Sequence, residues 1–151
     1  METIVIQSDI NNIVEVERFV YAVCDTFNIN NYAGVITMSL LQAVENAIIH
    51  GNNSDPSKTV KISFDQCRGG VYFEVTDEGR GFDFRSLLGG GNDSNENRGL
   101  FLMKSLADHL SFANNGATVR LDYIINGIEA SRALERISTL RRHYVVHEVE
   151  A

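Results

Sequence analysis

Residues 40–53 read Leu-Leu-Gln-Ala-Val-Glu-Asn-Ala-Ile-Ile-His-Gly-Asn-Asn, and this stretch decides the fold. Gln42 and Asn46 stand one turn apart on the far side of the predicted helix, where two carboxamides can be held over a ligand. Gly51 suits the left-handed position past a helix end, so we expect the helix to stop there. The opposite face is apolar at helical spacing, which predicts that the helix lies on a core; its residues are Leu40, Leu41, Val44, Ala47 and Ile48.

Helical spacing of apolar residues extends this helix and predicts two more. We expect the central helix over about 32–50, a first helix over 10–27 and a third over 99–110. Residues 89–98 are rich in glycine and asparagine and have no apolar periodicity, so they are predicted to form a loop.

Alternation of apolar and polar residues predicts one short strand and two antiparallel hairpins. The short strand is residues 3–8, one hairpin joins 58–65 to 71–76, and the other joins 110–113 to 118–123. The second hairpin turns at Asn114-Asn115-Gly116, a strong tight-turn signal. This order of elements predicts an α+β fold, a two-layer α/β sandwich whose mainly antiparallel sheet is covered by helices on one face.

The length of 151 residues fits one domain. We expect a domain over residues 1–125 and a C-terminal helical extension over 126–151. In that extension, rough helical spacing relates Ala133, Leu134, Ile137, Leu140 and Tyr144. We favour a packed or frayed added helix over a partner-binding helix, because additions at chain ends are common.

Charge and hydropathy exclude several classes of partner. The chain has 20 acidic and 13 basic residues and a net charge of −7, which argues against a nucleic-acid partner. No apolar run approaches the roughly 18 residues of a membrane span, and Met1 does not lead into a secretion signal. We therefore expect a cytoplasmic protein with no membrane partner. Cys24 and Cys67 form neither a disulfide framework nor a metal-ligand spacing.

Three short boxes carry a family resemblance. They are Asn46-Ala-Ile-Ile-His-Gly51, Asp77-Glu-Gly-Arg-Gly81 and Arg98-Gly99-Leu100. Together they resemble the boxes of the GHKL ATPase superfamily, the Bergerat-fold group that includes gyrase and the histidine kinases. Within it the chain looks most like the small bacterial anti-sigma-factor serine/threonine protein kinases. A single Gly-x-Gly is a weak signal, but three boxes in the right order are a strong one.

The resemblance implies that the chain binds ATP and Mg²⁺. It assigns Asn46 to the metal ion, since a carbonyl oxygen is a suitable ligand for a hard cation. It assigns Asp77 to the amino group of adenine. Gly79 and Gly81 would let the backbone approach the flat base without a Cβ in the way. The family likeness also places the hydroxyl group of Thr118 near the adenine.

The third box is implied to lie beside the phosphates. Gly99, followed by Leu100, is expected to open a helix whose free N–H groups favour a phosphate. Arg98 could add positive charge there, and a solvated arginine is an equal alternative. Residues 89–97 correspond to the family's lid over the nucleotide.

Two positions depart from the family pattern, and the milder departure is Asn97, where the third box often has its first glycine. Active relatives have a glutamate base four residues before the metal asparagine, and here that catalytic position is Gln42. An amide cannot take a proton, so general-base help of roughly 10²- to 10⁴-fold would be missing. Glu45 is a nearby carboxylate, but it is turned by about 60° and raised by about 4.5 Å relative to Gln42. Its use as the base would require a distorted helix.

Three functions remain open on this sequence. The first is a serine/threonine kinase that phosphorylates an anti-sigma-factor antagonist, with Glu45 or substrate assistance replacing the base. The second is a nucleotide-dependent binding module that controls a sigma factor with little turnover. The third is a detached histidine-kinase ATPase domain. It fits less well because the sequence shows no dimerising helical hairpin with a phosphoacceptor histidine, and His50 belongs to the first box. A homodimer is compatible with all three.

Overall fold

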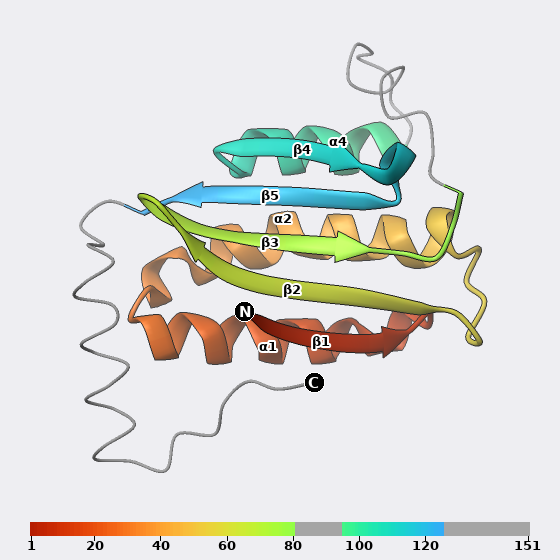
Figure 1. The fold of residues 1–151 in the computed structure, drawn as a ribbon, viewed down its shortest axis with the longest axis horizontal. Helices are drawn as coiled ribbons and strands as arrows, with labels where there is room; N and C mark the ends of the chain where they lie inside the picture. The colour runs from red at the N-terminus through yellow and green to blue at the C-terminus, as the bar shows by residue number, and fades with distance from the viewer. Residues whose placement is uncertain (81–94, 126–151) are drawn as a thin grey trace.

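The computed structural model describes residues 1–80 and 95–125 and arranges them in two layers (Figure 1). A twisted sheet forms one layer, and the helices of the described part lie together on one of its faces. Gly81, most of the predicted loop 89–98 and the extension 126–151 lie outside these described residues. The predictions for them stay predictions.

All four strand pairs of the sheet are antiparallel. Across the sheet the strands follow the order β1 (Glu2–Gln7), β2 (Thr59–Cys67), β3 (Gly70–Thr76), β5 (Thr118–Ile124) and β4 (His109–Ala113). β2 with β3 and β4 with β5 are the two predicted hairpins. The predicted α+β sandwich, with helices on one face of an antiparallel sheet, is therefore confirmed.

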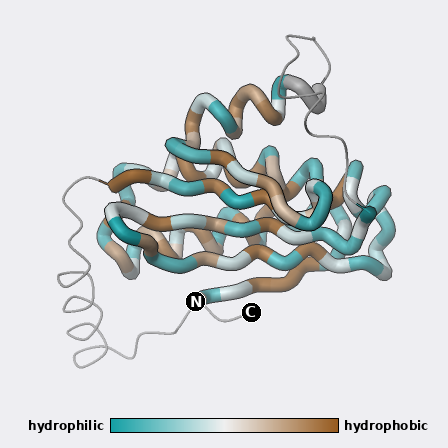
Figure 2. The backbone as a smooth tube through the Cα atoms, turned by 45° about the horizontal axis from the view of Figure 1, so that its top comes forward, coloured by the Kyte–Doolittle hydropathy of each residue, from teal (hydrophilic) through white to brown (hydrophobic). Residues whose placement is uncertain are grey.

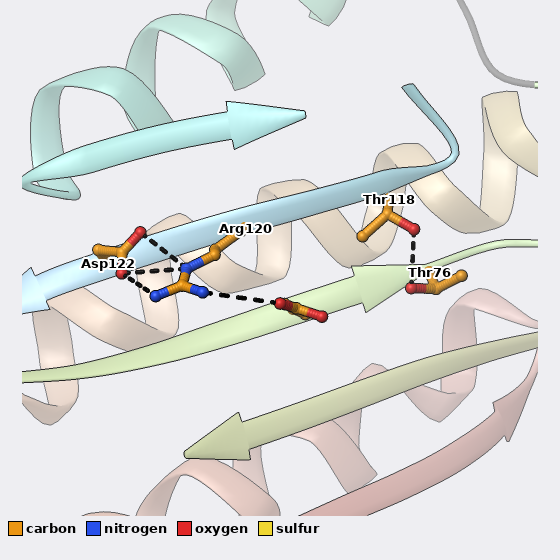
Figure 3. A network of polar contacts seen from close by, with 5 residues as sticks. Thr76, Thr118, Arg120 and Asp122 are labelled. Atoms are coloured by element: carbon orange, nitrogen blue, oxygen red, sulfur yellow. Dashed lines mark hydrogen bonds and ion pairs between the residues drawn. The ribbon is translucent and has the colours of Figure 1, made fainter. Parts of the chain in front are cut away.

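Alternation along the strands gives the sheet two unlike faces, and Figure 2 shows hydrophobic and hydrophilic residues alternating along them. The face under the helices is buried and includes Val60, Ile62, Phe64, Val71, Phe73, Val75, Val119, Leu121 and Tyr123. On the opposite face, Arg120 donates to both carboxylate oxygens of Asp122 (Figure 3). The guanidinium of Arg120 also lies 3.7 Å from the centre of the Tyr72 ring. The same guanidinium is 3.9 Å from the Glu74 carboxylate, so these contacts join β3 and β5.

The helical layer consists of α1 (Ile13–Phe27), α2 (Ala33–Asn46) and α4 (Asn95–Leu106), and α2 packs against both of the others. Short 3₁₀ turns, η1 (Ile10–Asn12) and η2 (Asn30–Tyr32), lead into α1 and α2. A π-helical turn, η3 (Ala47–Gly51), continues α2. α2 buries Ile36, Leu40 and Val44 completely, as the apolar face of the opening stretch predicts.

A polar contact crosses the core between α2 and β5. The hydroxyl oxygens of Ser39 and Tyr123 lie 2.5 Å apart, and both residues are buried. Because the Ser39 hydroxyl donates to the Val35 carbonyl oxygen at 2.8 Å, the Tyr123 hydroxyl is the donor to Ser39. Burial, the largest cause, raises the pKa of Tyr123, which keeps this hydroxyl protonated.

Two predicted helix boundaries are wrong. α4 begins at Asn95, four residues before the expected start at Gly99, and ends at Leu106. Leu110, which the sequence places both at the end of this helix and at the start of the last hairpin, belongs to β4, where it lies on the same face as Phe112 and both are partly buried. Residues 95–98 are polar and have no apolar periodicity, so the pattern could not place them in a helix.

The end of the central helix also differs from the prediction. Gly51 is not in the left-handed region; Asn53 (φ 53°) and Ser54 (φ 56°) are. Asparagine tolerates this region better than most residues, which allows the chain to turn there without glycine. The requirement for glycine at position 51 therefore comes from a close contact in the candidate site, described below.

One helical stretch, Asn30–Gly51, has the length and mean hydropathy of a membrane span, contrary to the expectation from apolar runs. In the structure this stretch contains the helix that packs on the sheet. Ile36, Leu40, Val44 and Ile48 of this stretch are buried in the core, whereas Val35, Met38 and Ile49 are exposed, so core packing accounts for part of its apolar composition.

Candidate nucleotide-binding site

A cavity opens where α2 and η3 face the end of β3, the start of β5 and α4. Its empty volume is about 270 Å³, part of it open to solvent. Among the described residues, the two polar side chains that line the cavity are Asn46, the last residue of α2, and Asp77, directly after β3. The other lining residues are small or apolar: Ala43, Ala47, Val75, Met103, Phe112, Gly116, Ala117 and Val119. The structure thus brings together the first two predicted site residues.

Two hydrogen bonds hold Asp77, one made by its backbone and one by its side chain. Its N–H donates to the Ala117 carbonyl oxygen at 2.9 Å, and its Oδ1 accepts from the Gly79 N–H at 2.7 Å. Only 9% of Asp77 is exposed. Burial raises the pKa of this carboxyl group, while the hydrogen bond from Gly79 and the charge of Lys58 oppose the rise.

Two glycines allow the backbone to pack against this carboxylate. A Cβ on Gly51 would collide with Asp77, whose Oδ1 would be 2.8 Å away and whose Oδ2 and Cγ would be closer still. A Cβ on Gly79 would collide with the carbonyl group of Gly51. Close approach of two chain segments therefore requires glycine at both positions. The sequence suggested a different reason for each, a helix stop at Gly51 and room for a base at Gly79.

Asn52 is a buried residue of the site that the sequence did not single out. It has no exposed surface, and its side chain joins three segments of the chain. Its Nδ2 donates to Ser8 Oγ at 2.7 Å and to the Thr59 carbonyl oxygen at 2.9 Å. Its Oδ1 accepts from the Glu78 N–H at 2.8 Å. Its only sequence signal is its position directly after Gly51, in a polar run typical of a solvated loop.

Gln42 and Asn46 lie on the flank of α2 that faces α4, not on the side away from the core as the helical wheel suggested. A Cβ on Gly99 would lie 3.1 Å from Gln42 Oε1 and 3.5 Å from Asn46 Nδ2. Gly99 is therefore the point where α4 approaches the two carboxamides. It is the fifth residue of α4, so the expectation that it opens the helix with a free N–H is wrong.

Three other residues that the sequence assigned to the site, Glu45, Arg98 and Leu100, are not among the described residues that line the cavity. Glu45 is partly buried on α2 but does not line the cavity. Leu100 is 3% exposed and belongs to the hydrophobic core, whereas Arg98 is exposed. Neither side chain lines the cavity in the described part of the chain.

Thr118 is not brought together with Asp77 in the cavity. It is the first residue of β5, and its hydroxyl group lies 3.1 Å from that of Thr76 (Figure 3). The same hydroxyl group accepts from Asn114 Nδ2 at 3.0 Å. Its neighbours Ala117 and Val119 line the cavity. Strand alternation explains the difference, because a strand with Val119 directed to the helical face directs Thr118 to the other face.

This lining suits a nucleotide. Val75, Met103 and Phe112 offer apolar surface to a flat base, and Asp77 offers a hydrogen-bond acceptor beside it. Asn46 offers a side-chain carbonyl oxygen to a hard cation. In the described residues, no three His, Cys, Asp or Glu side chains gather as a metal site. Phosphate oxygens and water could supply the other ligands of a magnesium ion at Asn46.

A comparison with models of protein families gives a match that covers most of the chain. The model of the histidine kinase-like ATPase domain matches residues 6–123, a range that begins in β1, ends in β5 and includes the whole cavity. No curated protein matches the chain at a significant level.

Proposed function

This chain belongs to the histidine kinase-like ATPase domain family, and on that basis we propose that it is an ATP- and magnesium-dependent regulator of the anti-sigma type. ATP-binding is the general property of the family. The GHKL resemblance seen in the three boxes is confirmed by this membership. The metal ion, the partner and any phosphoryl transfer are parts of the proposal.

The observation that carries the proposal is the shared cavity of Asn46 and Asp77. Asp77 is a buried acceptor among apolar lining residues, where it can accept a hydrogen bond from the amino group of a base. Asn46 lies on the α2 side, where its carbonyl oxygen can coordinate a cation that neutralises phosphate charge. Bound ATP would supply the triphosphate and the transferable phosphoryl group, and the protein would orient it.

The direct test is an equilibrium titration of the protein with ATP, with magnesium and with a chelator. We expect binding in both conditions and tighter binding with magnesium. Asn46→Ala should remove the magnesium enhancement and leave magnesium-free binding largely unchanged. Asn31→Ala, a substitution of an exposed asparagine in η2 whose backbone is outside the left-handed region, is the matched control. Absence of nucleotide binding by the wild-type protein would refute the proposal.

Gln42 favours regulation over rapid catalysis. Its amide group cannot accept a proton, and Glu45, the nearby carboxylate, does not line the cavity. We therefore expect ATP to act mainly as a ligand that changes affinity for a protein partner. By resemblance, that partner is a sigma factor or an anti-sigma-factor antagonist. Serine phosphorylation of an antagonist is the second candidate.

The partner is tested with purified proteins. Sigma factors and antagonists from the same organism are each titrated with this protein in the presence of ATP, ADP or no nucleotide. We expect one of them to bind with an affinity that depends on the nucleotide. If nucleotide binding is normal but no such protein binds, the anti-sigma assignment is wrong and the ATP assignment stands.

A further inference from the structure

We infer that Asn52 is a positioning residue that fixes the Asp77 carboxylate relative to α2 and thereby sets the preference for adenine. The inference rests on the proposed function, because it concerns how the same site recognises its base. Asn52 does not line the cavity, so it would act through the Asp77–Gly79 segment.

The first argument is that the carboxamide group of Asn52 is completely buried and that both of its polar atoms form hydrogen bonds. Asn52 has no exposed surface, and both Nδ2 and Oδ1 of its side chain have hydrogen-bond partners. A buried carboxamide carries a large desolvation cost unless all its groups are paired. The loop 52–58 leaves the helix through Asn52, whose own N–H donates to the Ala47 carbonyl oxygen at 2.9 Å. The side chain is thus anchored to the helix end.

The second argument is the geometry of the joined segments. The Glu78 N–H donates to Asn52 Oδ1 and thereby attaches the peptide between Asp77 and Glu78 to the helix end. That peptide group is directly attached to the Cα of Asp77. On the same side, the Gly51 backbone lies against the carboxylate. Asn52 therefore connects the end of α2, which carries Asn46, to Asp77, the residue assigned to the base.

Asp77 also has supports that do not involve Asn52. Its N–H bonds to Ala117 on β5, and the Glu78 carboxylate accepts from Thr59. These contacts hold Asp77 to the sheet. The bond to Asn52 holds it to the helix, and the distance between helix and sheet determines the fit of a flat base. Loss of Asn52 should thus alter base recognition more than it alters contacts to the phosphates.

The test compares ATP with inosine triphosphate, which has a carbonyl oxygen in place of the adenine amino group. Each is titrated against the wild-type protein, Asn52→Ala and Ser8→Ala. We expect the wild-type protein to prefer ATP. In Asn52→Ala the ATP preference should fall about tenfold, while the affinity for inosine triphosphate changes less than about threefold. Ser8→Ala removes another partner of the same buried network but keeps the Glu78 bond, so its preference should stay at the wild-type value.

The outcomes separate the inference from the proposed function. Equal losses of both nucleotides in Asn52→Ala, or an unchanged ratio, would make Asn52 a purely structural residue and overturn the inference. A wild-type protein that binds both nucleotides equally would refute the role of Asp77 itself. Should Asn52→Ala fail to fold, amide hydrogen exchange of Glu78 in the wild-type protein decides. Slow exchange supports the bond to Asn52, and exchange at the unfolded-chain rate overturns the inference.

Discussion

The backbone of Gly51 lies directly against the carboxylate of Asp77, so a single added methyl group would push the two apart. Gly51→Ala should therefore displace Asp77 and weaken ATP binding by about tenfold or more, the value of a hydrogen bond to a charged group. Overpacking should also lower the free energy of unfolding by about 1–3 kcal/mol. Nucleotide titration and urea denaturation measure the two effects.

Gly34 provides the matched control for that substitution. It lies in α2, and a Cβ there would meet no atom within 4 Å. Gly34→Ala should keep ATP affinity and raise the free energy of unfolding by about 0.4–1 kcal/mol, because alanine loses less backbone entropy. Equal ATP affinities in the two variants would contradict the close packing of Gly51 on Asp77.

Asp77→Asn should weaken ATP binding and stabilise the protein without nucleotide at neutral pH. Loss of the charged acceptor should cost about 10- to 100-fold in ATP affinity. The pKa of Asp77 is raised above its ordinary 3.8, so the folded state binds this proton more tightly than the unfolded chain does. The free energy of unfolding is then highest at low pH and falls as pH rises through the raised pKa. The stability gain of the variant should appear at pH 7 and vanish below the ordinary pKa.

ATP affinity of the wild-type protein should have its own pH dependence. A carboxyl group accepts a hydrogen bond fully only when it is ionised. Because burial raises the pKa of Asp77, affinity should decline on acidification at a pH above that expected for an exposed aspartate. Titrations across this range with wild type and Asp77→Asn measure the effect, and a parallel decline in both would assign it to other groups.

Gln42→Glu should raise any phosphoryl transfer to a partner serine by about 10²- to 10⁴-fold, because it restores a proton acceptor at the family's catalytic position. Transfer is followed with γ-labelled ATP and a purified antagonist. Glu45→Gln in the wild-type background is the control and should have no effect, since Glu45 does not line the cavity. If Gln42→Glu stays inactive while partner binding depends on ATP, the binding-module function is favoured.

Removal of the Ser39 hydroxyl group should lower the free energy of unfolding more than removal of the Tyr123 hydroxyl group. Tyr123→Phe leaves Ser39 bonded to the Val35 carbonyl oxygen and should cost about 1 kcal/mol. Ser39→Ala leaves a buried Tyr123 hydroxyl without its acceptor and should cost more, about 1–3 kcal/mol. Urea denaturation of both variants checks the order, and a smaller cost for Ser39→Ala would contradict the assigned direction of donation.

Local patterns were sufficient for most of the fold. Alternation in 58–65 and 71–76 predicted β2 and β3, and helical spacing predicted α1 and α2 to within a turn, because these elements bury one regular face. α4 was misplaced because its first turn is polar and because Leu110 fits both a helix and a strand pattern. Strand alternation alone indicates that Thr118 and Val119 lie on opposite faces of the sheet, so the sequence was sufficient to place Thr118 away from the helical face.

The site was predicted less completely, for a physical reason. Asn46 and Asp77 could be found because their residue types occur in recognisable boxes, and the structure places both in one cavity. The reasons for Gly51 and Gly79 depend on contacts across the fold, which local sequence does not encode. Asn52 resembles an ordinary loop residue until Ser8, Thr59 and Glu78 are brought around it.

The strand order bears on how the chain is synthesised. β5 is the last strand of the described part, yet it lies between β3 and β4 and not at an edge. A nascent chain that has not yet released Ile124 from the ribosome lacks an interior strand, and β3 has only β2 to pair with. Nonsense truncations upstream of β5 should therefore yield aggregation-prone fragments instead of a smaller folded protein, because they expose unpaired strand edges.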